Sequence, residues 1–326
     1  MGKIVVTGGA GFIGSHIADG LASQGDQIII LDNLSTGKTE NIQHLVAGKR
    51  AEFIHGDILN LPLLQKIFEG VEYVFHEAAI PGVPQSVDNP AASNETNVTG
   101  TLNVLIAARD NKVKKVIFAS SCAVYGNDPT LPKNECSVID LSSPYAATKL
   151  AAEYYCQVFN RVYGLATASL RYFNVYGPRQ NIKSEYAAVV PKFIEQIQEG
   201  KNPRIFGDGE QSRDFVYVKD VVAANLVIAK SNAVGVFNIG YGEKVSLNNL
   251  VETLGSLLDR EDISPQYLEQ RPGDIKHSCS DISKARKAGY TPRYGLMTGL
   301  KDMLSKVSPT EKDKTNTLIE KRDSNN

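Results

Sequence analysis

The stretch "TGGAGFIG" at residues 7–14 decides the fold of this chain. It follows an apolar run, "KIVVTG" at 3–8, that predicts a buried strand, and it opens an amphipathic stretch at 11–24 that predicts a helix. Three of its glycines are evenly spaced: Gly8, Gly11 and Gly14. Glycine lets the backbone turn tightly here and lets a pyrophosphate approach the helix N-terminus, where free N–H groups and the helix dipole bind anions.

An acidic residue follows where a dinucleotide site needs one. The run "QIIILD" at 27–32 predicts a second strand, and Asp32 ends it, 18 residues after Gly14. A carboxylate at this point accepts hydrogen bonds from the adenosine ribose hydroxyls and repels a 2′-phosphate, which favours NAD over NADP. A lone glycine triplet is equally typical of an ordinary tight turn, but strand, helix and acid together favour a cofactor loop. Asp57 closes the third strand, where it either reaches the adenine or caps a loop.

The rest of the first half continues the alternation of strands and helices. Further strands are expected at 51–57, 71–79, 114–121 and from 165, and helices at 93–111 and from Tyr145 to 163. This pattern predicts an α/β fold, a Rossmann-type doubly wound parallel sheet with a smaller C-terminal substrate-binding α/β lobe. We expect the NAD-binding domain at 1–175 and a mainly substrate-binding lobe at 176–304, with helices at 186–199, 218–230 and 246–258. The polar stretch 305–326 is expected to be a disordered tail.

Composition narrows the class of protein. The 326 residues carry a net charge of −1, so no basic excess indicates a nucleic-acid or membrane partner. No apolar run approaches the length that spans a bilayer, and no secretory leader is expected at the start. The four cysteines form no CxxC pair, so we expect free thiols in a cytoplasmic protein and no metal site: Cys122, Cys136, Cys156 and Cys279.

The stretch "SPYAATK" at 143–149 places Tyr145 and Lys149 four residues apart, on one face of the expected helix. An ammonium group one turn away favours the phenolate and lowers the pKa of a tyrosine. Taken alone, this spacing is also typical of a surface pair, with the tyrosine packed on its helix.

Several motifs in order resemble the extended short-chain dehydrogenase/reductase superfamily over residues 3 to about 300. They are the glycine-rich loop, "HEAA" at 76–79, "SSCAVYG" at 120–126 and the Tyr145–Lys149 spacing. Within that superfamily the chain resembles nucleoside-diphosphate-sugar 4-epimerases, on "RYFNVYGPRQ" (171–180), "GDGEQSRDFVYVKD" (207–220) and "RPGD" (271–274). The stretches "SVDNP" (86–90), "YAAVVPKF" (186–193) and "HSCSDISKA" (277–285) are most similar to UDP-N-acetylglucosamine 4-epimerases.

The resemblance implies roles for individual residues. Tyr145 is the expected base, Lys149 holds the nicotinamide ribose, and Ser121 hydrogen-bonds the reacting sugar oxygen. The implied NAD-binding residues are Gly8, Gly11, Phe12, Ile13, Gly14, Asp32, Asn33, Asp57, Ile58, Ala78, Tyr145 and Lys149. The implied UDP-sugar contacts are Ser86, Ser121, Tyr145, Asn174, Arg213, Arg271, Asp274 and Ser278. Arg213 and Arg271 would bind the diphosphate, although a surface pair of Arg213 with Asp214 is the alternative.

This reading implies an isomerase of carbohydrate metabolism that inverts C4 of a UDP-hexose through a 4-keto sugar. Related dehydratases carry an acidic pair before "VYG", where this chain has Cys122 and Ala123. Glucose-restricted epimerases carry a bulky tyrosine where this chain has Ser278, so UDP-GlcNAc and UDP-GalNAc are the expected substrates. Galactose-specific epimerases often carry a lysine near "HEAAIPG", where this chain has Ile80 and Pro81, and this departure weakens the transfer of their sugar contacts to this chain.

Three alternatives or additions stay open from the sequence. One is a UDP-glucose 4-epimerase restricted to sugars without the acetamido group. Another is a regulator that binds NAD(H) without catalysis, which has no need for Ser121, Tyr145 and Lys149 together. The helices at 93–111 and 145–163 resemble the pair that forms a dimer interface in relatives, so a homodimer is expected.

Overall fold

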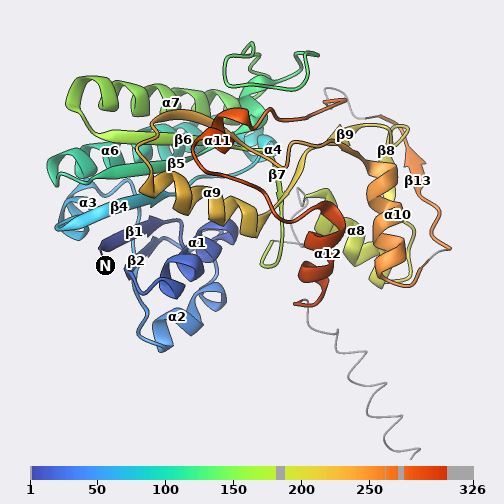
Figure 1. Ribbon diagram of the computed structural model, residues 1–326, viewed down its shortest axis with the longest axis horizontal. Helices are drawn as coiled ribbons and strands as arrows, with labels where there is room; N and C mark the ends of the chain where they lie inside the picture. Colours follow the sequence, from blue (N-terminus) through green and yellow to red (C-terminus); the bar gives the residue numbers. More distant parts are fainter. Residues whose placement is uncertain (1, 181–187, 261, 271–274, 307–326) are drawn as a thin grey trace, which may run out of the picture.

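The computed structural model describes residues 2–180, 188–260, 262–270 and 275–306. At its centre lies a sheet of seven strands in the order β11-β6-β5-β4-β1-β2-β3, all parallel (Figure 1). The strands are β1 (Lys3–Thr7), β2 (Gln27–Asp32), β3 (Ala51–His55), β4 (Val71–His76), β5 (Lys115–Ser121), β6 (Ala166–Tyr172) and β11 (Gly235–Ile239). The chain runs to opposite sides from β1, towards β2 and towards β4, and ligands bind parallel sheets at the carboxyl ends beside such a reversal.

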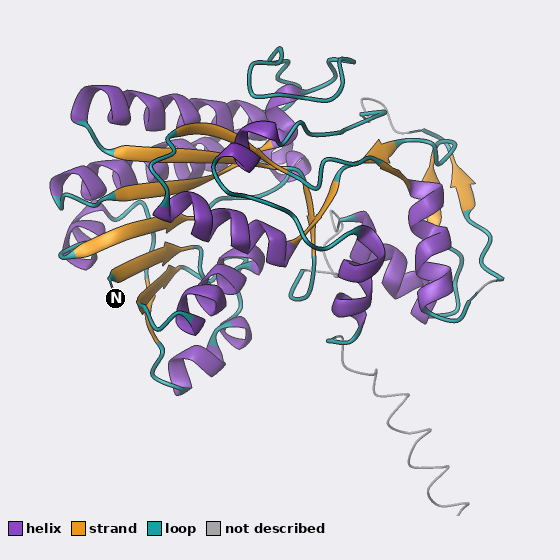
Figure 2. Cartoon of the chain, viewed as in Figure 1, coloured by secondary structure: helices purple, strands orange, loops and turns teal. Residues whose placement is uncertain are grey.

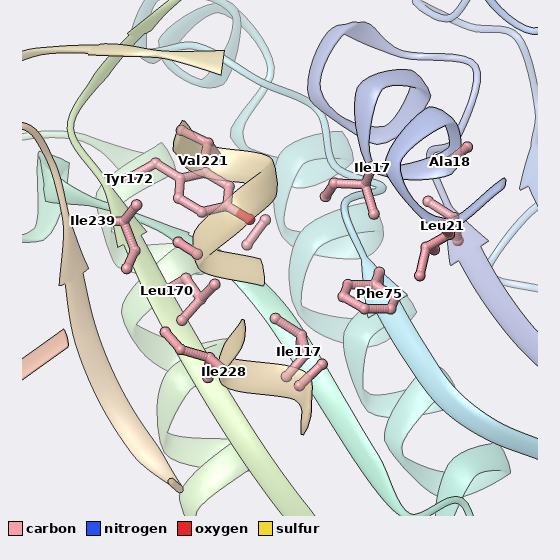
Figure 3. Close-up of a cluster of buried hydrophobic side chains, with 14 of the residues drawn as sticks. Ile17, Ala18, Leu21, Phe75, Ile117, Leu170, Tyr172, Val221, Ile228 and Ile239 are labelled. Atoms are coloured by element: carbon pink, nitrogen blue, oxygen red, sulfur yellow. The ribbon is translucent and has the colours of Figure 1, made fainter. Parts of the chain in front are cut away.

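Helices cover both faces of this sheet, as the apolar strands require (Figure 2). One face carries α1 (Phe12–Ser23), α2 (Gln43–Ala47), α9 (Val218–Lys230) and α11 (Ser283–Lys287). The opposite face carries α3 (Leu61–Ile67), α6 (Thr101–Asp110) and α7 (Pro144–Tyr163). Figure 3 shows the first face, where Ile17 and Leu21 of α1 lie beside Phe75 of β4, and Val221 and Ile228 of α9 lie beside Leu170 and Tyr172 of β6. The expected doubly wound α/β fold is confirmed.

The long helix expected at 93–111 is present as three consecutive helical segments. They are α5 (Pro90–Asn94), a π-helical turn at Glu95–Gly100, and α6. Asn97 in the π-helical turn donates to Ile80 O and to Thr148 Oγ1, and its own Oδ1 accepts from Ile80 N at 2.8 Å. This amide therefore ties the loop after β4 to α7, and a π-helical turn at such a junction is typical of functional sites.

A smaller lobe lies beyond the carboxyl end of the sheet (Figure 1). Its helices are α8 (Val189–Gln198), α10 (Leu247–Leu257) and α12 (Leu296–Leu304), which share one core. Its strands form three pairs: β8 (Arg204–Phe206) with β13 (Gln266–Leu268), β9 (Ser212–Arg213) with β12 (Val245–Ser246), and β7 (Asn174–Tyr176) with β10 (Phe215–Tyr217). The remaining helices of the described residues are short. They are the α-helix α4 (Val83–Asp88) and the 3₁₀ helices η1 (Thr39–Asn41) and η3 (Cys122–Tyr125).

The chain passes between the sheet and the lobe more than once. After residue 176 it returns to the sheet as α9, β11 and α11, whose apolar side chains belong to the core of the large sheet. The domain boundary at residue 175 therefore stays a prediction. In the structure, segments that follow this residue in the chain complete the sheet formed by the segments before it. Of the expected tail, residues 307–326 lie outside the described residues. Among the described helices, none has both the length and the apolar character needed to cross a bilayer.

Candidate active site

The glycine-rich loop is as tight as its spacing predicts. Gly8 has φ +66°, and a Cβ there would lie 2.6 Å from Ala78 N. A Cβ on Gly14 would lie 2.3 Å from Gly8 O, so the start of α1 can pack on the loop only with glycine at this position. Gly11 is the N-cap of α1 and makes no side-chain cap, and Phe12 and Ile13 form the first turn. The loop thus presents a bare helix N-terminus, which suits a pyrophosphate.

Acidic and amide groups line the ends of the next two strands. Asp32 accepts from Ala10 N at 2.9 Å and from Leu34 N at 2.8 Å, so its carboxylate is held beside the glycine-rich loop. Asn33 Nδ2 donates to Asp57 at 2.8 Å, and Asp57 also accepts from Leu59 N. Asp57 therefore caps its loop and contacts Asn33 as well. Ile58 follows and is buried.

Polar side chains also join β1, β4 and α6 behind this loop. Thr7 Oγ1 lies 2.7 Å from His76 Nδ1, and His76 Nε2 lies 2.9 Å from Thr101 Oγ1. Burial lowers the pKa of His76 to about 3, and the charge of Lys149 lowers it further, so the ring is neutral at ordinary pH. This chain of hydrogen bonds fixes the end of β4, from which Ala78 packs against Gly8.

Ser121, Tyr145 and Lys149 come together at the carboxyl ends of β5 and β4. Ser121 ends β5 and its hydroxyl accepts from Ala123 N at 3.1 Å, which starts η3. Tyr145 lies in the first turn of α7, where Ser86 Oγ accepts from its backbone N at 2.9 Å. Lys149 Nζ donates to Ala119 O at 2.8 Å and lies 5.8 Å from the centre of the Tyr145 ring. The alternative of a surface pair is therefore excluded, because Lys149 is only 3% exposed.

The electrostatics of this pair differ from the expectation. Burial raises the pKa of Tyr145 to about 12; a hydrogen bond with Ser121 lowers it, and the charges of Cys122 and Glu77 raise it. Burial lowers the pKa of Lys149 to about 8. The expected lowering of the Tyr145 pKa is therefore wrong for the protein's own groups, because desolvation of the phenol outweighs the hydrogen bond with Ser121 and the nearby charges act in the same direction as burial.

On the lobe side, β9 gathers several of the expected sugar-nucleotide contacts. Ser278 N donates to Ser212 O at 2.9 Å, and Arg213 Nη1 donates to the same oxygen at 3.0 Å. Asn174 N donates to Asp214 O, and Asn174 Oδ1 is buried without a hydrogen-bond partner among the described residues. Such an orphaned acceptor is typical of a group that receives its partner from a ligand.

Asp214, the alternative partner of Arg213, is fully buried and serves the backbone. Its carboxylate accepts from Tyr241 N, Gly242 N and Ser280 N, and from the Ser280 hydroxyl. It therefore holds the segment at Ser280 against the turn that follows β11. Arg271 and Asp274, also expected to contact the nucleotide, lie outside the described residues.

Comparison with known proteins identifies the family. The chain matches the NAD dependent epimerase/dehydratase family over residues 4–240, which is most of its length. It belongs to that family. The glycine cradle, the bare helix N-terminus and Asp32 fit the family's cofactor, NAD.

Several relatives of this epimerase-family enzyme are UDP-sugar 4-epimerases. The UDP-glucose 4-epimerase of Mycolicibacterium smegmatis is 38% identical over 303 residues, which cover 91% of this chain and 96% of that protein. A solved UDP-N-acetylglucosamine 4-epimerase from Methanobrevibacter ruminantium, in complex with UDP-N-acetylmuramic acid, is 44% identical with a TM-score of 0.89, covering 94% of this chain and 99% of that one. The UDP-glucose 4-epimerase of Thermus thermophilus, solved in complex with NAD, is 35% identical with a TM-score of 0.83, covering 93% and 98%.

One residue at the centre of the enzyme's site was not singled out from the sequence. Glu77 stands in the "HEAA" motif, and its Oε1 accepts from Tyr172 OH at 2.9 Å. The sequence signal that could have identified Glu77 is its position directly after a buried strand. Charged residues are rarely buried at such a position without a partner. Ser86 was expected to contact the sugar, and in the structure its hydroxyl is engaged by Tyr145 N and Val83 O.

Proposed function

We propose that this enzyme interconverts UDP-GlcNAc and UDP-GalNAc by inverting C4 of the sugar, and that it also accepts UDP-Glc and UDP-Gal. At the coarser level it is an NAD-dependent UDP-sugar 4-epimerase, as its family and relatives show. The observation that carries the finer proposal is Ser278, a small residue whose backbone N donates to Ser212 O of β9 at 2.9 Å. The similarity to a UDP-N-acetylglucosamine 4-epimerase supports the same choice.

The chemistry assigned to the protein's own groups is proton transfer at O4. Tyr145 takes the O4 proton and later returns it, and Ser121 donates a hydrogen bond to the same oxygen. Lys149 supplies a positive charge beside the phenol, which favours its ionised form. Bound NAD supplies the oxidation and reduction at C4. The flat keto carbon that results is the point at which the configuration is lost and reset.

The nucleotide must stay bound while the sugar turns over. We assign this anchoring to the lobe, with Arg213 and Arg271 on the diphosphate, Asp274 on the ribose and Asn174 near the diphosphate and sugar. The unpartnered Asn174 Oδ1 supports its part of this assignment. No carboxylic acid stands at Cys122 or Ala123, so a proton donor for dehydration or decarboxylation is missing from that position.

The test is an epimerase assay with both pairs of sugars. We expect purified enzyme to convert UDP-GalNAc to UDP-GlcNAc without added NAD+, because a hydride that returns to the same sugar gains nothing from cofactor release. Ser278→Tyr should lower kcat/KM for UDP-GlcNAc and UDP-GalNAc by roughly tenfold to a hundredfold. The reason is steric, because a phenol ring and an acetamido group cannot occupy the same space. Activity on UDP-Glc and UDP-Gal should survive.

Ser256→Tyr, on the exposed side of α10, is the matched control and should leave both pairs unchanged. Equal loss on both pairs by Ser278→Tyr would mean damage to the lobe, and retention of both would remove Ser278 from the sugar pocket. Conversion of only UDP-Glc and UDP-Gal by the wild-type enzyme would establish the glucose-restricted alternative. Binding of NAD(H) without any turnover would establish the regulator.

We further propose that the enzyme is a cytoplasmic homodimer. Three exposed apolar residues follow the helical period along α7: Tyr154 is 57% exposed, Val158 48% and Val162 64%. At the end of the same helix the Arg109 guanidinium of α6 lies 5.0 Å from the Tyr163 ring centre, so α6 borders this face. A second copy would cover the stripe. All four cysteines are free, which suits a reducing compartment.

A further inference from the structure

Glu77 lies where β4 meets the glycine-rich loop. Its backbone N donates to Thr7 O at 3.1 Å, and its carbonyl carbon lies 2.9 Å from the position that a Cβ on Gly8 would take. The residue is thus fixed between the end of β4 and the loop. Its side chain leaves this junction towards β6, where Oε1 meets the Tyr172 hydroxyl.

A chain of buried polar groups orients the Glu77 carboxyl. Asn225 Nδ2 of α9 donates to Tyr172 OH at 2.8 Å, and Tyr172 OH donates to Glu77 Oε1 at 2.9 Å. Asn225 is fully buried and also donates to Val221 O. Figure 3 shows the Tyr172 ring packed among Val221, Leu170 and Ile239, so the phenol that holds Glu77 cannot swing away. The site is therefore built from three elements, β4, β6 and α9.

His76 pairs with Phe118 across β4 and β5, so Glu77 follows at the same edge of the sheet as Ala119, whose carbonyl oxygen accepts from Lys149 Nζ at 2.8 Å. Burial raises the pKa of Glu77 to about 7, while the hydrogen bond from Tyr172 and the charge of Lys149 lower it. In return, the Glu77 carboxylate raises the pKa of Lys149 and of Tyr145. His76 is neutral at ordinary pH and adds no charge.

Other groups act on the same pair from further along α7 and β5. Glu153 and Cys156 also raise the pKa of Lys149, and Cys122 raises that of Tyr145. Glu153 is bound to Arg171, which offsets its charge. Glu77 alone among these groups acts on both Lys149 and Tyr145, and it titrates near neutrality.

We propose that Glu77 is a positioning residue of the epimerase, whose carboxylate keeps Lys149 in its ammonium form and opposes ionisation of Tyr145. The proposal rests on the roles given above to Tyr145 and Lys149. Above neutral pH the ionised Glu77 holds the lysine proton, and below it the neutral carboxyl releases that hold. Below neutral pH Lys149 binds its proton with or without Glu77, so the ionised carboxylate extends the alkaline end of the range in which a charged Lys149 stands beside Tyr145.

The first test reads proton binding and not turnover. Enzyme labelled with ¹³C at glutamate Cδ is titrated by NMR, and the Glu77 signal is the one absent from Glu77→Gln. We expect its midpoint near neutrality, at about 7. Tyr172→Phe removes the hydrogen bond that stabilises the carboxylate, so it should raise this midpoint. A midpoint in the ordinary range of glutamate, about 4 to 5, would overturn the proposal.

The second test reads Lys149 in enzyme labelled with ¹³C at lysine Cε, using Lys149→Arg to assign its signal. In Glu77→Gln the amide oxygen still accepts the hydrogen bond from Tyr172. We expect the Lys149 midpoint to fall from about 8 by roughly one pH unit, which is the lower end of the pKa shift that one neighbouring charge causes. Glu72→Gln is the matched control, since it is the same change on β4 at a surface pair with Lys114. An unchanged Lys149 midpoint in Glu77→Gln would overturn the proposal.

Turnover gives a third reading that separates this proposal from the proposed function. The kcat–pH profile of Glu77→Gln should move towards acid by a similar amount, because both Lys149 and Tyr145 then lose protons at lower pH. The same profile in Glu72→Gln should stay in place. If Tyr145→Phe kept full activity, the assigned base would be wrong, while the NMR midpoints would still report whether Glu77 controls Lys149.

Discussion

At the scale of single residues, we assign the role of base to the Tyr145 phenol, although burial disfavours its ionised form. The protein's own groups raise the pKa of Tyr145 to about 12, chiefly through burial. Lys149 is held by Ala119 O and has its pKa lowered by the same desolvation. A buried phenol keeps its proton until a positive charge nearby favours the phenolate. We therefore expect Tyr145 to transfer its proton only when the cofactor and the sugar are bound.

The role of the phenol is tested by Tyr145→Phe, which keeps the ring and removes the group that accepts the proton. General-base catalysis contributes about 10²–10⁴-fold, so kcat should fall by that factor while the Kd for UDP-sugar stays close to that of wild type. Steady-state kinetics and calorimetric titration measure the two quantities. Tyr154→Phe, on the exposed side of the same helix, is the matched control. A kcat within a few-fold of wild type would remove Tyr145 from the mechanism.

At the scale of elements, α7 carries the site and its two ends are well defined. Ser143 Oγ accepts from Ala146 N at 3.2 Å, Pro144 opens the first turn, and Gly164 ends the helix with φ +70°. Ser86 from α4 accepts from Tyr145 N, so the turn that carries the phenol is attached to a second helix. These contacts fix where the phenol stands relative to β5 and Ser121.

A buried ion pair attaches α7 to the neighbouring strand. Glu153 is fully buried and receives Arg171 Nε at 2.9 Å and Nη2 at 2.7 Å, while Ser120 Oγ donates to the same carboxylate at 2.5 Å. Ser120 precedes Ser121 on β5, and Glu153 lies one turn after Lys149. One carboxylate therefore joins α7, β5 and β6 directly behind the catalytic groups.

Removing this charge should destabilise the protein. Glu153→Gln leaves the Arg171 guanidinium buried without its counter-charge, and breaking such a pair costs about 3–5 kcal/mol of the free energy of unfolding. Denaturant unfolding measures the loss. Asp262→Asn breaks an exposed pair with Arg260 and should cost at most about 1 kcal/mol. Equal small losses in both variants would show that the buried pair contributes no more than a surface one.

At the scale of the whole molecule, sheet and lobe are joined through several crossings of the chain. Lys133 N donates to Cys279 O at 2.8 Å and Asp281 N donates to Lys133 O at 2.7 Å, which ties the loop after η3 to the segment that follows Ser278. Asp214 adds the links to Tyr241, Gly242 and Ser280. The segment of Ser278, which we assign to the sugar, is therefore hydrogen-bonded to segments that pack on the sheet carrying the Tyr145 site.

The proposed dimer gives a prediction at the same scale. Val162→Glu places a charge in the exposed stripe of α7, and burying it against a second copy would be unfavourable without a partner. We expect wild-type enzyme to sediment as a dimer and Val162→Glu to sediment as a monomer at the same concentration. Val234→Glu, at another exposed valine in the loop before β11, should remain dimeric. A monomeric wild-type enzyme would contradict the proposal.

Much of the fold follows from local patterns in the sequence. The strands β1 to β6 lie where apolar runs predict them, because a strand covered on both faces needs side chains that avoid water at every position. The glycine spacing and Asp32 predict the cofactor loop for a similar reason: the backbone turn, the helix start and the acid are all near one another in sequence. The Tyr145–Lys149 pair needs only one helical turn.

Tertiary structure alone decided the features whose partners come from far along the chain. The seventh strand, β11, is only "GVFNI" at 235–239, and its place beside β6 follows from pairing with a strand that the chain left 60 or more residues before. Burial raises the pKa of Glu77, and Tyr172, 95 residues away, and Lys149 of α7 partly offset this rise. The sequence determines which groups exist and their local geometry, but burial and distant charge set their protonation, because both depend on what folding brings together.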